Sequence, residues 1–206
     1  MHPQTLYPKT KQVLEKVKST GVLDNFYLAG GTALALQLGH RKSVDLDFFA
    51  EKFPERDLLL QKVQSLNPKI SQEAPGTLDL LIDNVKVSFL EYKYPLIKPR
   101  LDFEGMNIAS VADIACMKLT AISSRGSRKD FVDLSFILKT VSLTELLKIF
   151  EAKFKGIDYQ KLHIIKSLVF FDEADLEPEL DYTKPVDWNK VKKFIENGVK
   201  KYLSKI

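Results

Sequence analysis

The sequence predicts an α+β fold, in which a small mixed sheet flanked by helices occupies the first half of the chain and a helical C-terminal lobe follows. Three observations predict it. An apolar run at 26–29 ends at two glycines, and between residues 85 and 90 apolar residues alternate with a more polar set, as in a strand with one buried face. Residues 131–138 instead repeat apolar side chains at helical spacing.

The composition supports one large domain or two small lobes that share a cleft. The 206 residues are 45% hydrophobic, enough for a substantial core, and the net charge is only +4. No apolar run is long enough to cross a bilayer, and residues 1–12 lack the apolar core of a signal peptide, so we expect a cytoplasmic protein. The single cysteine, Cys116, excludes an internal disulfide and is expected to be a small buried side chain.

The first half predicts an alternation of helices and strands. Gly21 ends the first helix, and Asn67-Pro68 stops the helix that Pro54 opens. Asp83-Asn84 is a short turn that predicts an antiparallel hairpin. The expected helices are 8–19, 32–38 and 55–66, and the expected strands are 26–29, a segment carrying Asp45 and Asp47, 69–74, 77–82 and 85–92.

The second half predicts helices throughout, after a loop around Pro95 to Gly105. Ser110 and Ser142 are expected N-caps, with Asp113 and Glu145 at the capping-box position. Another helix is expected over 159–171, ending in the acidic residues 172–175, which we read as a solvated helix end. The final helix, 188–203, is expected to bury one apolar face, which comprises Val191, Phe194, Ile195, Val199 and Tyr202.

The most informative stretch is Phe26 to Ala50. Asp45 and Asp47 are two residues apart on an expected strand, so both carboxylates leave the same face. Neighbouring like charges repel, and a bound divalent cation is a common reason for such a pair. Gly30 and Gly31 precede a helix, where a backbone without Cβ atoms lets phosphate oxygens reach N–H groups.

The loop Arg41-Lys42-Ser43 offers two cations and a hydroxyl suited to a polyphosphate. Taken singly, the Gly-Gly pair is also explained by an ordinary turn, and Asp-x-Asp by a solvated strand face. Together they meet the phosphate, cation and metal requirements of phosphoryl transfer in one stretch.

Two blocks of sequence resemble those of a known family. The first is Gly30-Gly31-Thr32 with Arg41-x-Ser43-x-Asp45-Leu46-Asp47, and the second consists of segments 113–121 and 125–134. The first block is similar to the first signature of the DNA-polymerase-β-type nucleotidyltransferase superfamily. Both blocks together resemble the AbiEii/AbiGii toxin family of bacterial nucleotidyltransferases, and the likeness covers most of residues 10 to 175.

The resemblance implies a nucleotidyltransferase-type fold, a nucleotidyltransferase core over 1–105 and a helical lobe over 106–206 that completes the active-site cleft. It implies Mg²⁺ held by Asp45 and Asp47, and catalytic roles for Lys118, which neutralises triphosphate charge, and Asp130, as base or metal partner. It further implies a tRNA 3′ end as acceptor and a separate antitoxin protein. The nucleotide-binding residues that it implies are Gly30, Gly31, Thr32, Arg41, Ser43 and Lys118.

One position departs from the superfamily pattern. Many members carry a third metal-binding carboxylate on a strand that corresponds to 85–92, where this chain has Ser88, a weak metal ligand. Glu73 and Glu91 are the substitutes that the sequence offers, and alternation does not choose between them.

Other interpretations stay open in the second half. Asp113 is explained by helix capping, and Lys118 with Arg125 by a solvated stripe. Asp133 either shares the face of Asp130 or pairs with Lys129 or Arg125. The lysines of the last helix, Lys190, Lys192, Lys193, Lys200 and Lys201, are either a phosphate-tracking surface for RNA or ordinary solvated side chains.

The activity itself also leaves alternatives. The acceptor of the nucleotide is an RNA, a protein or a small molecule. Because Ser88 replaces a carboxylate, a non-catalytic module that binds a nucleotide or a partner is the competing class of function.

Overall fold

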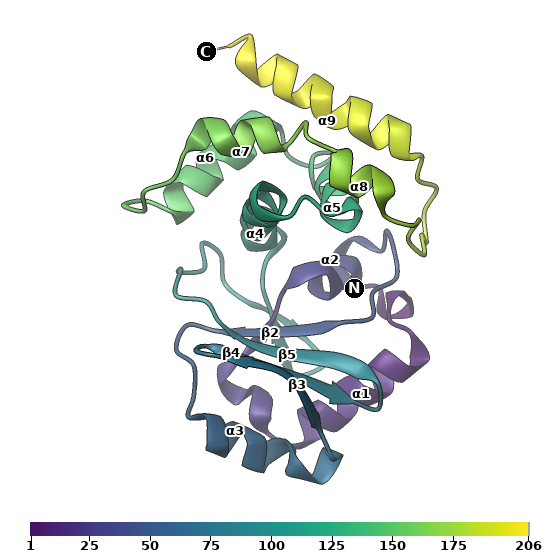
Figure 1. Ribbon diagram of the computed structural model, residues 1–206, viewed down its shortest axis with the longest axis vertical. Helices are drawn as coiled ribbons and strands as arrows, with labels where there is room; N and C mark the ends of the chain where they lie inside the picture. Colours follow the sequence, from purple (N-terminus) through teal and green to yellow (C-terminus); the bar gives the residue numbers. More distant parts are fainter. Residues whose placement is uncertain (206) are drawn as a thin grey trace. The chain divides into compact units, whose positions relative to one another are not determined.

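A computed structural model describes residues 1–205 and divides the chain into two compact units, Met1–Ser110 and Val111–Ile206 (Figure 1). The first unit contains the sheet and the second is helical, which confirms the α+β class. No helix within the described residues is both long and apolar enough to span a lipid bilayer.

The first unit follows the expected order of helices and strands. Its helical segments are η1 (Pro3–Thr5), α1 (Pro8–Ser19), η2 (Val22–Asn25), α2 (Gly30–Leu38), α3 (Arg56–Val63) and η3 (Gln64–Leu66). Its strands are β1 (Tyr27–Leu28), β2 (Leu46–Ala50), β3 (Lys69–Ala74), β4 (Thr77–Ile82), β5 (Val85–Glu91), β6 (Leu101–Phe103) and β7 (Met106–Ile108).

Within residues 1–205 these strands form one seven-stranded mixed sheet of order β3-β4-β5-β2-β1-β7-β6. The β2–β5 and β1–β7 pairs are parallel and the others are antiparallel. The predicted hairpin is the β4–β5 pair. Asp83 and Asn84 both adopt positive φ, 51° and 64°, as a two-residue type I′ turn requires.

One face of the sheet is the core of the first unit. Phe48 and Phe89 on neighbouring strands are fully buried with their rings stacked 5.7 Å apart, and Phe26 meets Phe89 edge-on at 5.1 Å. Val13 and Val17 of α1 are also fully buried. Figure 1 shows α1 and α3 on one side of this sheet and α2 on the other. The apolar alternation of β5 therefore faces α1, and its polar alternation faces the side of α2.

The β6–β7 hairpin occupies the segment that the sequence predicts as a loop. Its three-residue strands are too short to show an alternating pattern. β7 extends the sheet beside β1, where the Ala109 amide donates to the Leu28 carbonyl oxygen at 2.9 Å. The division between units falls after Ser110, whereas the sequence places a domain boundary at 105/106.

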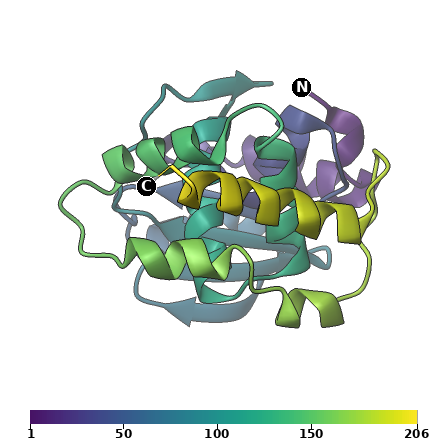
Figure 2. The same ribbon diagram turned by 90° about the horizontal axis from the view of Figure 1, so that it is seen from above.

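The second unit contains α4 (Val111–Ser124), α5 (Arg128–Ile137), α6 (Leu143–Lys153), α7 (Lys161–Ser167), α8 (Asp172–Leu176) and α9 (Trp188–Leu203). α4 packs against α5, α6 and α7, and α9 packs on α5 and α6. Seen from above, α9 (yellow) lies in front of the other helices of its unit (Figure 2). The Ser142 cap is confirmed, since its hydroxyl accepts from the Glu145 amide. The acidic residues 172–175 form a short helix, α8, rather than a helix end.

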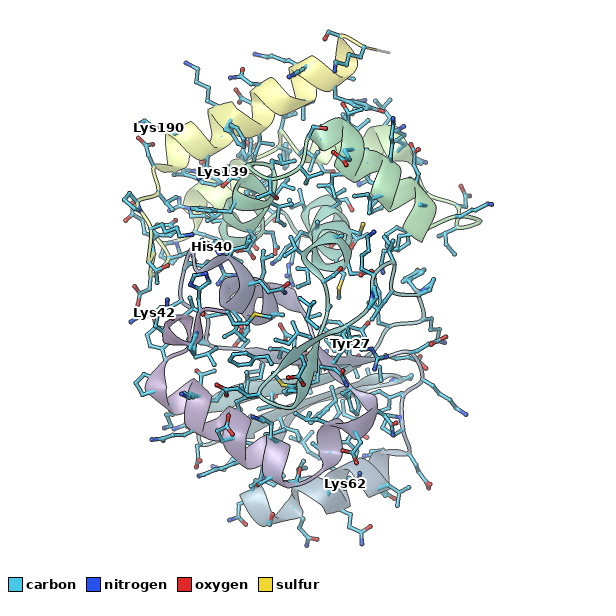
Figure 3. The ribbon with its side chains drawn as sticks, turned by 180° about the vertical axis from the view of Figure 1, so that it is seen from behind. Tyr27, His40, Lys42, Lys62, Lys139 and Lys190 are labelled. Carbon is cyan, nitrogen blue, oxygen red and sulfur yellow. The ribbon has the colours of Figure 1, made fainter. Side chains whose placement is uncertain are left out.

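The apolar face of α9 is narrower than the sequence predicts. Val191 is buried but Phe194 is 42% exposed, so the prediction of a buried Phe194 is wrong. Phe194 lines an apolar hollow together with Phe136, and Lys139 and Lys190 line the same hollow (Figure 3). The Lys139 ammonium lies 3.8 Å from the centroid of the Phe136 ring.

Candidate active site

The bend between β1 and α2 is the first part of the candidate site. Gly30 adopts φ +67°, a conformation that favours glycine, and it begins α2, so the Gly-Gly pair forms the first turn of the helix instead of preceding it. Ala29 at the N-cap provides no side-chain cap to the helix. The first-turn N–H groups therefore form an anion-attracting helix terminus of a nine-residue helix.

Asp47 lies directly against this bend. The Ala29 amide donates to the Asp47 carbonyl oxygen at 3.0 Å, which fixes the strand to the turn. A Cβ atom at Gly30 would lie only 2.8 Å from Asp47 Oδ2. A glycine is thus needed at Gly30 for its backbone conformation and for the approach of the carboxylate.

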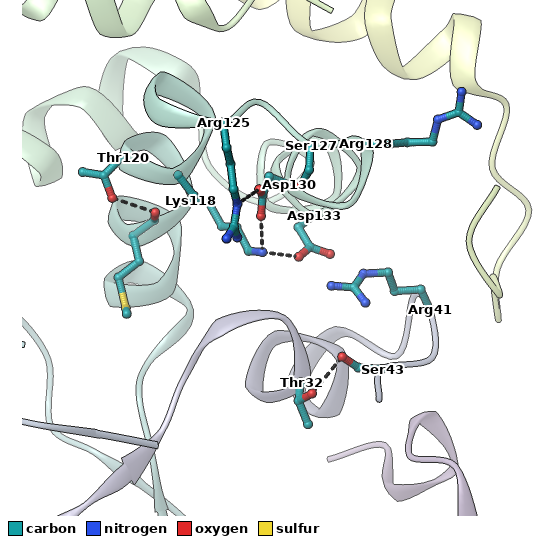
Figure 4. A network of polar contacts seen from close by, with 12 residues as sticks. Thr32, Arg41, Ser43, Lys118, Thr120, Arg125, Ser127, Arg128, Asp130 and Asp133 are labelled. Atoms are coloured by element: carbon teal, nitrogen blue, oxygen red, sulfur yellow. Dashed lines mark hydrogen bonds and ion pairs between the residues drawn. The ribbon is translucent and has the colours of Figure 1, made fainter. Parts of the chain in front are cut away.

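The loop before β2 is fastened to the same helix end. Arg41 is buried at 4% exposure, and a Cβ atom at Gly31 would collide with its guanidinium group. The Thr32 hydroxyl donates to the Asp45 carbonyl oxygen and is hydrogen-bonded to the Ser43 hydroxyl at 2.7 Å (Figure 4). Thr32 therefore couples the helix terminus to the start of the Asp-x-Asp segment.

The first unit thus brings together the predicted residues Gly30, Gly31, Thr32, Arg41, Ser43 and Asp47, with Asp45 on the adjoining backbone. Carboxylate oxygens are the ligands that Mg²⁺ prefers. Asp47 provides them from β2 beside the glycine bend, whereas Asp45 comes directly before β2, so the prediction that Asp45 lies on the strand is wrong. The two aspartates fit a divalent cation by their chemistry. Within residues 1–205 no group of three or more His, Cys, Asp or Glu side chains is arranged to hold a metal.

The second unit brings together the predicted residues Lys118 and Asp130. The Lys118 ammonium of α4 is buried and lies 2.7 Å from Asp130 Oδ1 and 2.7 Å from Asp133 Oδ2, both on α5 (Figure 4). The interpretation of Lys118 as part of a solvated stripe is therefore wrong. Asp133 pairs with this lysine, one helical turn after Asp130.

Asp130 is the centre of this cluster. Arg125 Nε donates to Asp130 Oδ2 at 3.1 Å, and the Ser127 hydroxyl donates to the same oxygen at 2.6 Å. Burial opposes ionisation of Asp130, but the charge of Lys118 and the bond from Arg125 outweigh it and hold the pKa of Asp130 below its usual value. Asp130 is therefore a carboxylate at neutral pH and a weak base.

A second buried ion pair supports the same helix. Asp113 of α4 and Lys153 of α6 have fully buried side chains, and Lys153 Nζ lies 2.8 Å from Asp113 Oδ1. Cys116 is buried as predicted, and burial raises the pKa of its thiol to about 12. Asp113, Lys153 and Cys116 are therefore assigned to the core packing of the second unit, because all three side chains are buried there.

Comparison with known proteins gives the family. A model of nucleotidyl transferase AbiEii toxins, type IV toxin–antitoxin system, matches residues 13–95 and 77–203. The chain belongs to the AbiEii nucleotidyl transferase toxin family. It is 40% identical over 213 residues to an uncharacterized protein of Aquifex aeolicus (strain VF5), with 96% of this chain and 98% of that protein covered.

Two solved structures share the fold of this AbiEii-family chain. JHP933 from Helicobacter pylori has 19% identity and a TM-score of 0.59, over 100% of this chain and 95% of that chain. MenT4, a nucleotidyltransferase toxin from Mycobacterium tuberculosis H37Rv, has 16% identity and a TM-score of 0.57, over 94% and 84%. The chain is accordingly a nucleotidyltransferase by family.

The sheet of this AbiEii-family protein also clarifies the missing third carboxylate. Ser88 on β5 is the residue opposite Asp47 on β2. Glu73 lies on the edge strand β3, ion-paired with Arg56 at 2.6 Å, and Glu91 lies opposite Ala50 at the far end of β2. Neither glutamate is a strand neighbour of Asp47.

Sequence reasoning missed Asp79, which lies opposite Ser88 on β4. Asp79 is only 4% exposed, and the Lys86 ammonium lies 2.7 Å from its Oδ2. A signal for it exists, because Leu78-Asp79-Leu80 is the apolar-Asp-apolar setting in which a third carboxylate is expected. In the superfamily pattern the third carboxylate lies at the position of Ser88, on the strand next to Asp47. Asp79 lies one strand further from Asp47.

Proposed function

We propose that the protein transfers a nucleoside monophosphate from an NTP, with Mg²⁺, to an acceptor hydroxyl at the 3′ end of a tRNA, and that it acts in the cytoplasm as the toxin of a toxin–antitoxin pair. One observation carries the catalytic part. The Asp47 carboxylate lies against the glycine that starts α2, so the metal-ligating group and the anion-attracting helix end adjoin one another.

The phosphates of the NTP are assigned to the start of α2 and the loop that follows the helix. Backbone N–H groups of Gly30, Gly31 and Thr32 suit phosphate oxygens, because helix N-termini carry partial positive charge. Arg41 adds a fixed guanidinium, and Ser43 adds a hydroxyl already oriented by Thr32. Buried and hydrogen-bonded groups of this kind are pre-oriented, which favours transition-state stabilisation.

Asp45 and Asp47 are assigned to the divalent cation. When bound, such an ion supplies positive charge to phosphate oxygens as negative charge builds during transfer. The acceptor oxygen bonds to the α-phosphorus, the bond from that phosphorus to the pyrophosphate oxygen breaks, and the hydroxyl proton leaves to solvent. Pyrophosphate and the nucleotidylated acceptor are the products.

Lys118 and Asp130 receive linked roles in this proposal. Lys118 is assigned to the charge of the triphosphate, as a cation held in place by two carboxylates. Its carboxylate partner Asp130 is assigned to orienting that lysine. The lowered pKa of Asp130 makes it a poor proton acceptor, so we prefer this role to that of general base.

An RNA acceptor is supported by the surface of the second unit. Lys190, Lys193, Lys200 and Lys201 are exposed along α9. The hollow with Lys139 and Lys190 adds exposed aromatic area beside cations (Figure 3), the combination on which bases stack and phosphates bind. The antitoxin partner is supported by family membership.

A labelling experiment tests the proposal. The protein is incubated with each α-labelled NTP, Mg²⁺ and, separately, tRNA, total protein and hydroxyl-bearing small molecules. We expect label on the tRNA 3′ end, loss of label with Asp45→Asn, and weaker transfer as salt rises, because phosphate contacts depend on counterion release. Label on protein alone rejects the tRNA acceptor, and tight nucleotide binding without transfer to any acceptor supports a non-catalytic module.

A further inference from the structure

Three residues form a row across the face of the sheet that carries the polar alternation of β5. Asp47 of β2 lies opposite Ser88 of β5, and Ser88 lies opposite Asp79 of β4. Directly paired residues of neighbouring strands project from the same face, so the two carboxylates and the hydroxyl between them point the same way. This is the face away from the Phe48–Phe89 core.

Lys86 belongs to the same face, since it precedes Ser88 by two residues on β5. Its ammonium lies 2.7 Å from Asp79 Oδ2, while its side chain remains 45% exposed. The Asp79 side chain is only 6% exposed, and a buried carboxylate needs a cation or hydrogen-bond donors to stay ionised. Asp79 is therefore the buried anchor of this ion pair, and Lys86 is its accessible cation.

Lys86 also lies within the electrostatic reach of the Asp-x-Asp pair. The hydrogen bond to Asp79 raises the pKa of Lys86 above its usual value, and the charges of Asp79, Asp47 and Asp45 raise it further. Asp47 pairs with Ser88, and Lys86 precedes Ser88 by two residues on β5, so Lys86 and Asp47 project from the same face of the sheet. Lys86 is thus a protonated cation beside the proposed metal ligands.

An ordinary surface ion pair in the same unit provides the contrast. Lys16 of α1 pairs with Asp83 at 2.6 Å, and both side chains are about half exposed, at 52% and 47%. Neither residue belongs to the row. Lys86 differs from Lys16 in having a buried anchor and in lying within the electrostatic reach of two further carboxylates, Asp47 and Asp45.

We propose that Lys86 is a fixed cation of the nucleotide site, anchored by Asp79, which binds the phosphate chain beside a single divalent ion held by Asp45 and Asp47. The inference rests on the proposed function. Phosphoryl-transfer sites with two metal ions place them about 3.5–4 Å apart, where each offsets phosphate charge. With Ser88 between Asp47 and Asp79, and Asp79 occupied by Lys86, the second positive charge comes from a side chain.

Mn²⁺ and inorganic triphosphate test this without knowledge of the base or the acceptor. Bound Mn²⁺ is counted from the loss of the free-ion electron paramagnetic resonance signal, and the dissociation constant of triphosphate is measured by calorimetry at fixed Mn²⁺. The variants are Lys86→Met, Lys86→Arg and the double variant Lys86→Met with Asp79→Asn. The matched control is Lys16→Met, which removes the lysine of the exposed pair.

We expect the wild type to hold one Mn²⁺ per chain with triphosphate, and Lys86→Met to weaken triphosphate binding about tenfold or more, the size of a lost charge-assisted hydrogen bond. Lys86→Arg retains the charge and should restore most of the affinity. The double variant avoids an unpaired buried carboxylate, so it reports on the lost cation even where Lys86→Met fails to fold.

Two Mn²⁺ ions in the wild type would overturn the inference. Wild-type triphosphate affinity in both Lys86→Met and the double variant would also overturn it. Asp45→Asn separates the two levels of the proposal. If it loses Mn²⁺ while the Lys86 variants bind like Lys16→Met, only the role of Lys86 fails. If Asp45→Asn binds Mn²⁺ and triphosphate like the wild type, the proposed function fails as well.

Discussion

The two units each bring a lysine and two or three aspartates together, and the difference between these clusters indicates what each can do. In the first unit Asp45 and Asp47 are partly exposed, and the ammonium of Lys86 is anchored to a different carboxylate, Asp79. In the second unit Lys118 is enclosed and bridges Asp130 and Asp133 at 2.7 Å each. The aspartates of the first cluster that we assign to a cation are thus accessible, whereas the lysine and both aspartates of the second cluster are buried.

We expect the loss of one charge to have opposite consequences in the two clusters. In the open cluster, neutralising an aspartate removes a ligand and relieves repulsion, so activity falls and stability does not. In the enclosed cluster, removing a charge leaves a buried charge of opposite sign less compensated, so stability falls.

Asp45→Asn should lower the rate of nucleotidyl transfer about a thousandfold, the upper range for loss of one group that stabilises transition-state charge. Its thermal midpoint should equal or exceed that of the wild type, because the repulsion from Asp47 is removed. Transfer assays and thermal unfolding of the same preparation measure both. A large drop in the thermal midpoint would show that Asp45 stabilises the fold, as the residues of the enclosed cluster do, and would contradict its assignment to the open cluster.

Lys118→Met should destabilise the protein by about 3–5 kcal/mol, the usual cost of removing one partner of a buried ion pair. Urea unfolding measures the change, and Lys193→Met on the exposed side of α9 is the control. An unchanged unfolding free energy would show that the cluster is open to water and that the comparison is mistaken.

Gly30→Ala should reduce transfer by about a hundredfold and cost about 1–2 kcal/mol of stability, because a side chain is strained at φ +67° and its Cβ would crowd Asp47 Oδ2. Gly105→Ala is the matched control. Gly105 has φ +79° but open space around it, so it carries the backbone strain without the clash. Equal transfer rates in the two variants would contradict a role for the Gly30–Asp47 contact.

The pH dependence of stability gives the smallest effect. Asp130 has a lowered pKa in the folded protein, so its contribution is fully present above the unfolded value near pH 4 and is lost as pH falls through the folded value. Unfolding free energies measured from pH 5 to pH 3 should fall less steeply for Asp130→Asn than for the wild type. If the unfolding free energies of the two proteins fell equally with pH, ionised Asp130 would not contribute to stability through the proposed ion pairs.

Much of the fold follows from local sequence signals. The Asp83-Asn84 turn, the alternation of β5, the Ser142 cap and the bounds of α9 all match the structure, because each depends on neighbouring residues. The β6–β7 hairpin does not, since β7 is held by pairing with β1, which lies far away in the chain, and β6 pairs only with β7.

The candidate site is also only partly predictable from local sequence signals. The Gly-Gly bend and the Asp-x-Asp pair are visible as spacing, and family resemblance adds Lys118 and Asp130. The spacing of residues does not reveal how deeply a side chain is buried. A solvated lysine and the buried Lys118 therefore give the same helical pattern in the sequence. Lys86 and Asp79 acquire meaning only from the strand register that sets Asp79 opposite Ser88 and Ser88 opposite Asp47.

The most direct test of the central claim is a crystal structure of the protein with Mn²⁺ and a non-hydrolysable NTP analogue, with manganese located by its anomalous signal. We expect manganese bound by carboxylate oxygens of Asp45 and Asp47, and phosphate oxygens at the backbone N–H groups of Gly30 and Gly31. Manganese bound away from both aspartates, or a triphosphate that does not reach the start of α2, would contradict it.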